Sequence, residues 1–165
     1  MIRRRTEADL PALERALRAV HEADGYPTVW PTDPRGFLAP PPAVGEWAAE
    51  VRGQVVGQVV LRPVPDPAPG WVRATGLPAP EVLILSRLFV APAARGQGLA
   101  RGLFRTAWTA ARTLGRRGIL DVHHQNLAAA HLYGREGWRR VGSVDGDWLD
   151  PDGTVPRAHV YVAPE

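Results

Sequence analysis

Cysteine is absent from all 165 residues of this chain. Neither a disulfide framework nor a thiolate metal site can therefore form, and we expect no bound metal. Lysine is absent too, because all 20 basic residues are arginine. This excludes a P-loop lysine and a Schiff-base lysine. The lack of cysteine is compatible with the cytoplasm, where we expect the protein to reside.

Long apolar runs are also missing. The longest, such as Val82–Leu85 and Leu88–Pro92, are far shorter than the ~20 residues that span a bilayer. The basic start, Met1–Glu7, has no apolar stretch behind it and does not resemble a secretory signal. We therefore expect no membrane association.

The charge balance argues against a nucleic-acid partner. The sequence pI is near 10.1, but the net charge is only +3 and the arginines are scattered. The densest clusters are Arg3–Arg5, Arg116–Arg117 and Arg139–Arg140, and none is interleaved with aromatics as a base-stacking surface would be. These arginines are interpreted as parts of solvated faces.

The length and the pattern of elements predict one α+β domain over residues 1–165, with a mixed central sheet flanked by helices on both faces. Thr6 and Asp9 form a capping-box-like start to a helix with an apolar stripe of Leu10, Leu13, Leu17 and Val20. Residues 25–42 are expected to form a loop with one helical turn, and residues 63–80 a surface excursion. The other expected helices cover Arg95 to about Leu114 and Asn126–Glu136, and the expected strands cover Ile2–Arg5, Trp47–Arg52, Val55–Leu61, Val82–Val90, Ile119–His123, Trp138–Val144 and Ala158–Val162.

The segment Arg95-Gly96-Gln97-Gly98-Leu99-Ala100 lies between a predicted strand and a predicted helix. Backbone N–H groups at a helix N-terminus are unpaired and favour anions. A dinucleotide fingerprint would need glycine at position 101, which is arginine, and a Walker A motif would need lysine. By itself, the segment fits an anion site or an ordinary tight turn equally well.

A second pattern follows downstream. Asn126 is a preferred helix cap, and Ala129 and Tyr133 lie four residues apart on one helical face. Leu132 precedes Tyr133, and Gly137-Trp138 ends the helix.

Together the two segments resemble the GNAT superfamily of acetyl-CoA-dependent N-acetyltransferases. The family's cofactor motif, Gln/Arg-x-x-Gly-x-Gly/Ala, is matched by Arg95, Gly98 and Ala100. Its later motif is matched by the residues named above from Asn126 to Trp138. The strong match covers Val82 to about Gly142.

The resemblance implies an N-acetyltransferase that uses acetyl-CoA, without a metal, to acetylate a primary amine by direct attack. The amides of Arg95–Ala100 would hold the pyrophosphate of coenzyme A, and the backbone of Leu88, Phe89 and Val90 would pair with the pantetheine arm. Tyr133 would be the general acid for the leaving thiolate. Asn126 would cap its helix and contact the pantetheine arm.

One departure from the family concerns the general base. Many relatives carry a glutamate in the central strand, where alignment places Ile84 and then Ser86. Neither is a strong base, so a water chain, Asp121 or His123 stays open. The missing carboxylate also motivates the main alternative, a non-catalytic acyl-CoA-binding sensor domain.

The acceptor is not specified by these motifs. A small amine, an amino acid, an antibiotic and a protein N-terminus all stay open, as do a longer acyl donor and a homodimer. We favour a structural ion pair over a substrate clamp for Arg87, which lies in an apolar strand. For Trp30 and Trp71 we favour loop anchoring over a pocket lining, and for Trp108 and Trp138 a place in the core.

Overall fold

A computed structural model describes residues 1–165. The chain forms a mixed seven-stranded sheet of order β1-β2-β3-β4-β5-β7-β6. It divides into two compact units, Met1–Arg62 with Leu85–Ala110, and Pro63–Ile84 with Ala111–Glu165. The α+β fold predicted from the order of elements is confirmed.

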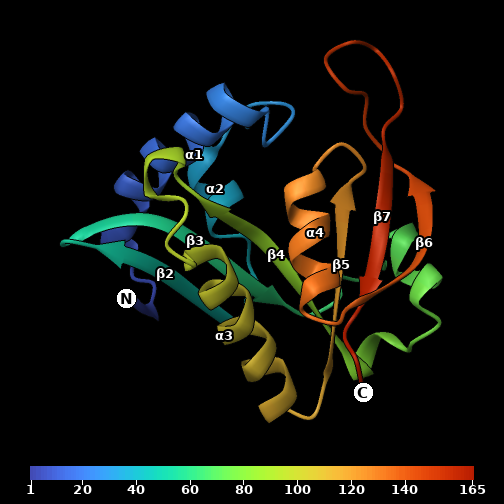
Figure 1. Cartoon of the computed structure of the whole chain (residues 1–165). Coiled ribbons are helices and arrows are strands. Elements are labelled where there is room, and N and C mark those ends of the chain that lie inside the picture. The colour runs from blue at the N-terminus through green and yellow to red at the C-terminus, as the bar shows by residue number, and fades with distance from the viewer. The chain divides into compact units, whose positions relative to one another are not determined.

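The first unit begins with β1 (Ile2–Arg4), a 3-10 turn and α1 (Leu10–Asp24). It continues through α2, β2 and β3, and then takes in the end of β4 and most of α3 (Figure 1). These elements comprise α2 (Pro34–Leu38), β2 (Gly45–Val51), β3 (Gln54–Arg62), β4 (Val82–Val90) and α3 (Leu99–Thr113). β2 pairs antiparallel with both β1 and β3, and the predicted hairpin across Arg52-Gly53 is confirmed.

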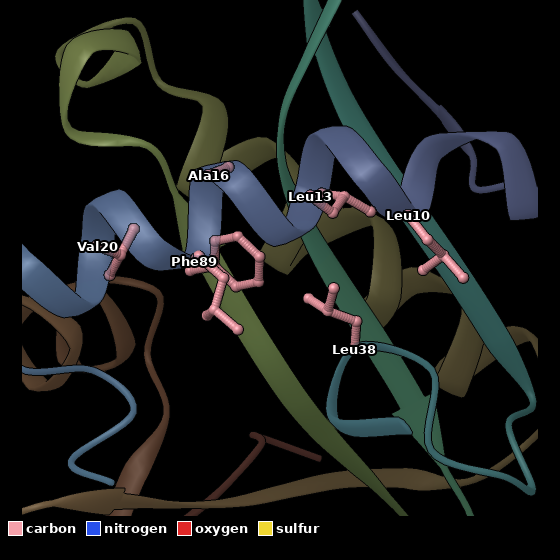
Figure 2. Packing of buried hydrophobic residues seen from close by; sticks show 7 residues of the cluster. Leu10, Leu13, Ala16, Val20, Leu38 and Phe89 are labelled. Atoms are coloured by element: carbon pink, nitrogen blue, oxygen red, sulfur yellow. The ribbon is translucent and has the colours of Figure 1, made fainter. Parts of the chain in front are cut away.

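Helix α1 forms where its capping signals predict. The capping box of Thr6 and Asp9 is present, and the helix ends at Gly25, whose φ of 72° suits glycine. Its stripe of apolar residues is buried and packs with Leu38 of α2 and with Phe89 of β4 (Figure 2). Burial of this stripe anchors one face of β4 in the first unit.

Both faces of the first unit's strands are covered. Consecutive residues of one strand point to opposite faces, yet Ala48 and Ala49 are both fully buried, as are Val59 and Val60. Ile2 of β1 contacts the position of Gly102 in α3. Such two-sided burial explains the continuous apolar runs that the strands show in place of alternation.

The second unit holds the start of β4, followed by the remaining strands and α4. These are β5 (Arg117–His123), α4 (Leu127–Arg135), β6 (Arg139–Asp145) and β7 (Arg157–Val162). β4 pairs with β5 in parallel over Val82–Ile84 only, and β7 pairs antiparallel with both β5 and β6.

Two predictions about the boundaries need correction. Helix α3 begins at Leu99 rather than Arg95, because Gly96 and Gly98 have φ of 82° and 76°, outside the right-handed helical region. The excursion over residues 63–80 is more than surface, since Val72 is buried in a cluster with Val82 and Ile84. No helix is long and apolar enough to cross a bilayer.

Candidate functional site

The end of β4 carries a local distortion at Arg87. This residue has a φ of 55°, and Arg52 of the β2–β3 turn is the only other non-glycine residue with a positive φ. Parallel pairing of β4 with β5 has already ended at Ile84. The distortion therefore lies directly before the predicted pantetheine-binding residues 88–90.

The direction of the backbone differs among these three residues. A Cβ on Gly57 of β3 would meet the carbonyl oxygen of Phe89, and the Ala91 amide donates to the Val56 carbonyl at 2.7 Å. Phe89 therefore presents its backbone to β3. Because the N–H and C=O groups of successive residues alternate in direction, those of Val90 point away from β3. Val90 is thus better placed than Phe89 to pair with an added chain.

The loop before α3 is exposed and rich in unused donors. The amides of Gly96, Gln97 and Gly98 make no hydrogen bond within the protein, and the Gly98 carbonyl accepts the Gly102 N–H at 3.0 Å. Residues 96–98 are exposed, and a Cβ at Gly96 or Gly98 would meet nothing within 4 Å. Consecutive free amides beside a helix N-terminus suit a phosphate group.

Side chains hold this loop against the rest of the first unit. The Arg95 guanidinium pairs with Asp24 at the end of α1, and its Nε donates to the Val90 carbonyl at 3.3 Å. Gln97 donates to the Ala94 carbonyl at 3.2 Å. The Arg95 amide already donates to the Pro92 carbonyl at 3.3 Å, so the loop's free amides begin at Gly96. Leu99 and Ala100 are half-buried at the start of α3.

In the second unit, Asn126 caps α4. Its Oδ1 accepts the Ala129 amide at 3.2 Å, and no group within the protein accepts a hydrogen bond from its side-chain NH₂. The predicted cap is confirmed, and a donor beside it is available for a ligand carbonyl.

Tyr133 is buried in the same helix, with only 7% of its surface exposed. Its ring packs edge-on against Tyr161 of β7, with centroids 5.6 Å apart. This contact fixes the plane of the phenol.

No side chain in β4 is suited to be a general base. Ile84 is buried, and Ser86 is half-buried with its hydroxyl 3.5 Å from the Val60 carbonyl. Asp121 is half-buried on β5. His123 is engaged by Asp150, a residue for which the sequence carries no signal because it lies in the turn-rich segment between β6 and β7.

The preferred interpretation of Arg87 was wrong. No carboxylate pairs with it; instead its Nε donates to the Phe37 carbonyl at 2.9 Å, and its guanidinium lies 4.0 Å from the Phe37 ring centroid. Trp30 lies under Arg18 and beside His21, which supports its loop-anchoring role.

The remaining tryptophans are placed largely as predicted. Trp71 packs against the buried cluster around Val72, and Trp138 is buried. Trp108 is half-buried beside Phe104. No group of three potential metal-ligating side chains occurs in residues 1–165.

Comparison with known proteins decides the family. The family model described as "Acetyltransferase (GNAT) family" matches residues 12–138. The chain belongs to the GNAT family. This GNAT chain is 38% identical over 106 residues to N-acetyltransferase 8 of Mus musculus, covering 64% of the chain and 43% of that protein. The chain thus spans less than half the length of this curated relative.

Solved GNAT structures share the fold over nearly the whole chain. Ribosomal-protein-alanine N-acetyltransferase from Brucella melitensis matches with a TM-score of 0.74 and 25% identity, covering 99% of this chain and 98% of that one. Arabidopsis thaliana NAA60, solved in complex with acetyl-CoA, matches with a TM-score of 0.74 and 19% identity, covering 99% and 97%.

Proposed function

We propose that this GNAT chain transfers an acetyl group from acetyl-CoA to a primary amine by direct attack in a ternary complex. The observation that carries the proposal is the set of three consecutive amides, at Gly96, Gln97 and Gly98, that no protein group accepts. They lie in the segment that resembles the family's cofactor motif, in front of α3, and all three residues are exposed. This arrangement fits the pyrophosphate of coenzyme A.

The arm of the donor is proposed to run along the end of β4. Pairing with β5 stops at Ile84, and the backbone groups of Val90 point away from β3. An extended amide-containing chain can add to such a strand through main-chain hydrogen bonds. Among Leu88, Phe89 and Val90, we therefore assign the pairing to Val90 and, by alternation, to Leu88.

The reaction needs no protein nucleophile. The neutral amine nitrogen forms a bond to the thioester carbonyl carbon, the carbon–sulfur bond breaks, and the thiolate leaves. A backbone N–H near the end of β4 would stabilise the oxyanion, and one such donor is typically worth ~2.7–4 kcal/mol. The proton lost by the amine passes to water, and the thiolate gains one from a general acid.

We assign the general acid to Tyr133, on the strength of its place in the family's later motif. Its buried ring, held by Tyr161, supports a fixed phenol in the second unit. A phenol is a weaker acid than a thiol, so it can protonate the leaving thiolate only when it is well placed. We assign a pantetheine contact to Asn126, whose side-chain NH₂ has no acceptor in the protein.

A second candidate is an acyl-CoA sensor that turns nothing over. The observation that favours it is the pair Ile84 and Ser86, which places no carboxylate in β4. Both candidates require the donor site, and only the enzyme requires release of free thiol.

Two measurements test the proposal. Millimolar acetyl-CoA should raise the melting temperature, because a ligand that binds only the native state stabilises it. A screen of small amines, amino acids and N-terminal peptides with acetyl-CoA should then release free thiol with at least one acceptor. Absence of any thermal shift would refute the donor site, and a shift without turnover would leave the sensor.

A further inference from the structure

Arg87 is held in a costly backbone conformation with its guanidinium fixed. A non-glycine residue rarely adopts a positive φ because its Cβ is then crowded by the backbone, and such strain concentrates at functional sites. The Phe37 carbonyl accepts its Nε–H, and the Phe37 ring covers one face of the guanidinium. The hydrogen bond to Phe37 uses one of the five N–H donors of the Arg87 guanidinium. The terminal NH₂ groups are directed by these two contacts but are not paired with any carboxylate.

Arg62 ends the neighbouring strand, β3, and lacks even that degree of pairing. Its Nε is buried from solvent and has no hydrogen-bond partner. A buried donor left unsatisfied is destabilising, more so when it is charged. Other arginines of this unit do have carboxylate partners: the partly exposed Arg3 pairs with Asp9, and the buried Arg5 pairs with Glu46.

β3 and β4 are neighbouring strands, and the Ser86 hydroxyl lies 3.5 Å from the Val60 carbonyl, so Arg62 and Arg87 both lie close to a contact between the two strands. Their electrostatics agree with this placement. Burial, and then the positive charge of Arg87, lower the pKa of Arg62. No carboxylate of the protein pairs with either arginine, so these two neighbouring cations have no counterion within the chain. A carboxylate matches the planar fork of a guanidinium and would relieve both the repulsion and the unmet donor.

The two arginines lie next to the segment assigned to the acyl donor, where an acceptor would have to bind. Arg87 directly precedes Leu88–Val90, the segment assigned above to the acyl donor. Aromatic rings lie beside it, since Tyr26 is 6.3 Å from Phe37 and 6.5 Å from Phe89 between centroids. All of these residues belong to the first unit.

We propose that Arg62 and Arg87 form a carboxylate-binding site for the acceptor, so that the substrate is an amino acid-like molecule carrying both an amine and a carboxylate. The proposal rests on the proposed acetyltransferase function for its acceptor, whereas the anion site itself does not depend on turnover. Phe37 is a positioning residue, which orients Arg87.

The kinetic test compares acceptors that differ only in charge. The panel contains α-, β- and γ-amino acids and the corresponding amides, in which a carboxamide replaces the carboxylate. We expect kcat/KM to favour the acid of the best pair by tenfold or more, the size of effect that charged hydrogen bonds produce. Arg62→Gln should remove most of this preference, whereas Arg62→Lys should keep part of it because a point charge remains.

The matched control is Arg15→Gln. Arg15 is exposed on α1 of the same unit, so this change removes the same charge without touching the site. It should leave the preference for the acid unchanged. An equal loss in both glutamine variants would show a long-range effect of net charge and overturn the site.

A binding measurement separates this inference from the proposed function. Sodium acetate, but not acetamide, should shift the NMR signal of the Arg62 Nε–H in the wild-type protein. If the protein acetylates amines without preferring acids, and acetate causes no shift, the carboxylate site is overturned and the acetyltransferase function stands. A shift with acetate in a protein that ignores acetyl-CoA would support the anion site and overturn the acetyltransferase.

Discussion

The imidazole of His123 bridges Asp150 and the backbone of Gln125. Its Nε2 lies 2.9 Å from Oδ2 of Asp150, and its Nδ1 accepts the Gln125 amide at 3.1 Å. A neutral ring whose Nδ1 accepts carries its proton on Nε2 and donates it to the carboxylate. Accepting a further proton from a substrate amine would therefore require one of these bonds to break.

His123→Gln should accordingly lower stability while retaining measurable turnover. Loss of a mostly buried hydrogen bond to a charged group should reduce the free energy of unfolding by roughly 1.5–3 kcal/mol, measured by urea denaturation. Without a single indispensable base, kcat/KM should keep rising with pH as free amine accumulates, and Asp121→Asn should also stay active.

The exposed His131 supplies the control for that experiment. His131→Gln should change neither stability nor the pH profile. A different result would show that His123 is the base. In that case kcat/KM of the wild type would level off near pH 6–7, and this inflection would be absent from His123→Gln but present in His131→Gln.

Gly98→Leu should abolish the thermal shift produced by acetyl-CoA. A side chain there would occupy the open space in front of the loop amides, and the φ of 76° would add strain. Gly115→Leu is a matched control, since Gly115 has a φ of 70° and equally open surroundings. Both variants should lose a similar 1–2 kcal/mol of stability, but only Gly115→Leu should still respond to acetyl-CoA. A normal response in Gly98→Leu would remove the loop from the donor site.

Tyr133→Phe should lower kcat by about 10²–10⁴-fold, the range for a positioned general acid. The affinity for acetyl-CoA, measured by calorimetry, should change little because the ring that packs on Tyr161 is kept. Tyr161→Phe removes the partner's hydroxyl instead and should retain kcat. Unimpaired turnover in Tyr133→Phe would mean that water or another group protonates the thiolate.

Asp9 should make stability depend on pH in the acid range. Two hydrogen bonds from the Arg3 guanidinium, at 2.8 and 2.9 Å, lower the pKa of Asp9 to about 2. A depressed carboxyl pKa stabilises the fold above the unfolded value near 4, and this contribution disappears as the pH falls from 4 toward 2.

The size of this effect should be about 2–3 kcal/mol at neutral pH, and Arg3→Gln should remove most of it. Urea denaturation between pH 2 and pH 6 would measure it. Exposed Arg15→Gln should leave the acid transition unchanged. A transition in Arg3→Gln identical to that of the wild type would contradict the assignment.

Much of the fold follows from local signals that the sequence displays. The capping box at Thr6, the stripe of α1 and the cap at Asn126 are satisfied by nearby residues, so their spacing is sufficient to predict them. The bounds predicted for β4 match those of the structure. The family was recognisable from the glycine segment before α3 only together with the later segment from Asn126 to Trp138.

The remaining features depend on residues that are distant in sequence. Asp150 meets His123 across 27 positions, and Phe37 meets Arg87 across 50. Neither contact has a periodic pattern or a turn signal. Arg87 in an apolar strand suggested an ion pair with a carboxylate. Its guanidinium instead contacts the carbonyl and the ring of Phe37 in α2.

The interleaving of the two units bears on how the protein can be made and cut. Each unit is assembled from two stretches of chain, and β4 supplies its first residues to one and its last to the other. No single cut therefore separates the two units cleanly, although a fragment that ends at Ala110 keeps every residue of the first unit. On the ribosome, the first unit has all of its residues once Ala110 has emerged, whereas the second must wait for the last strand. The loop at residues 95–98 can therefore meet all of its first-unit contacts before α4 has been synthesised.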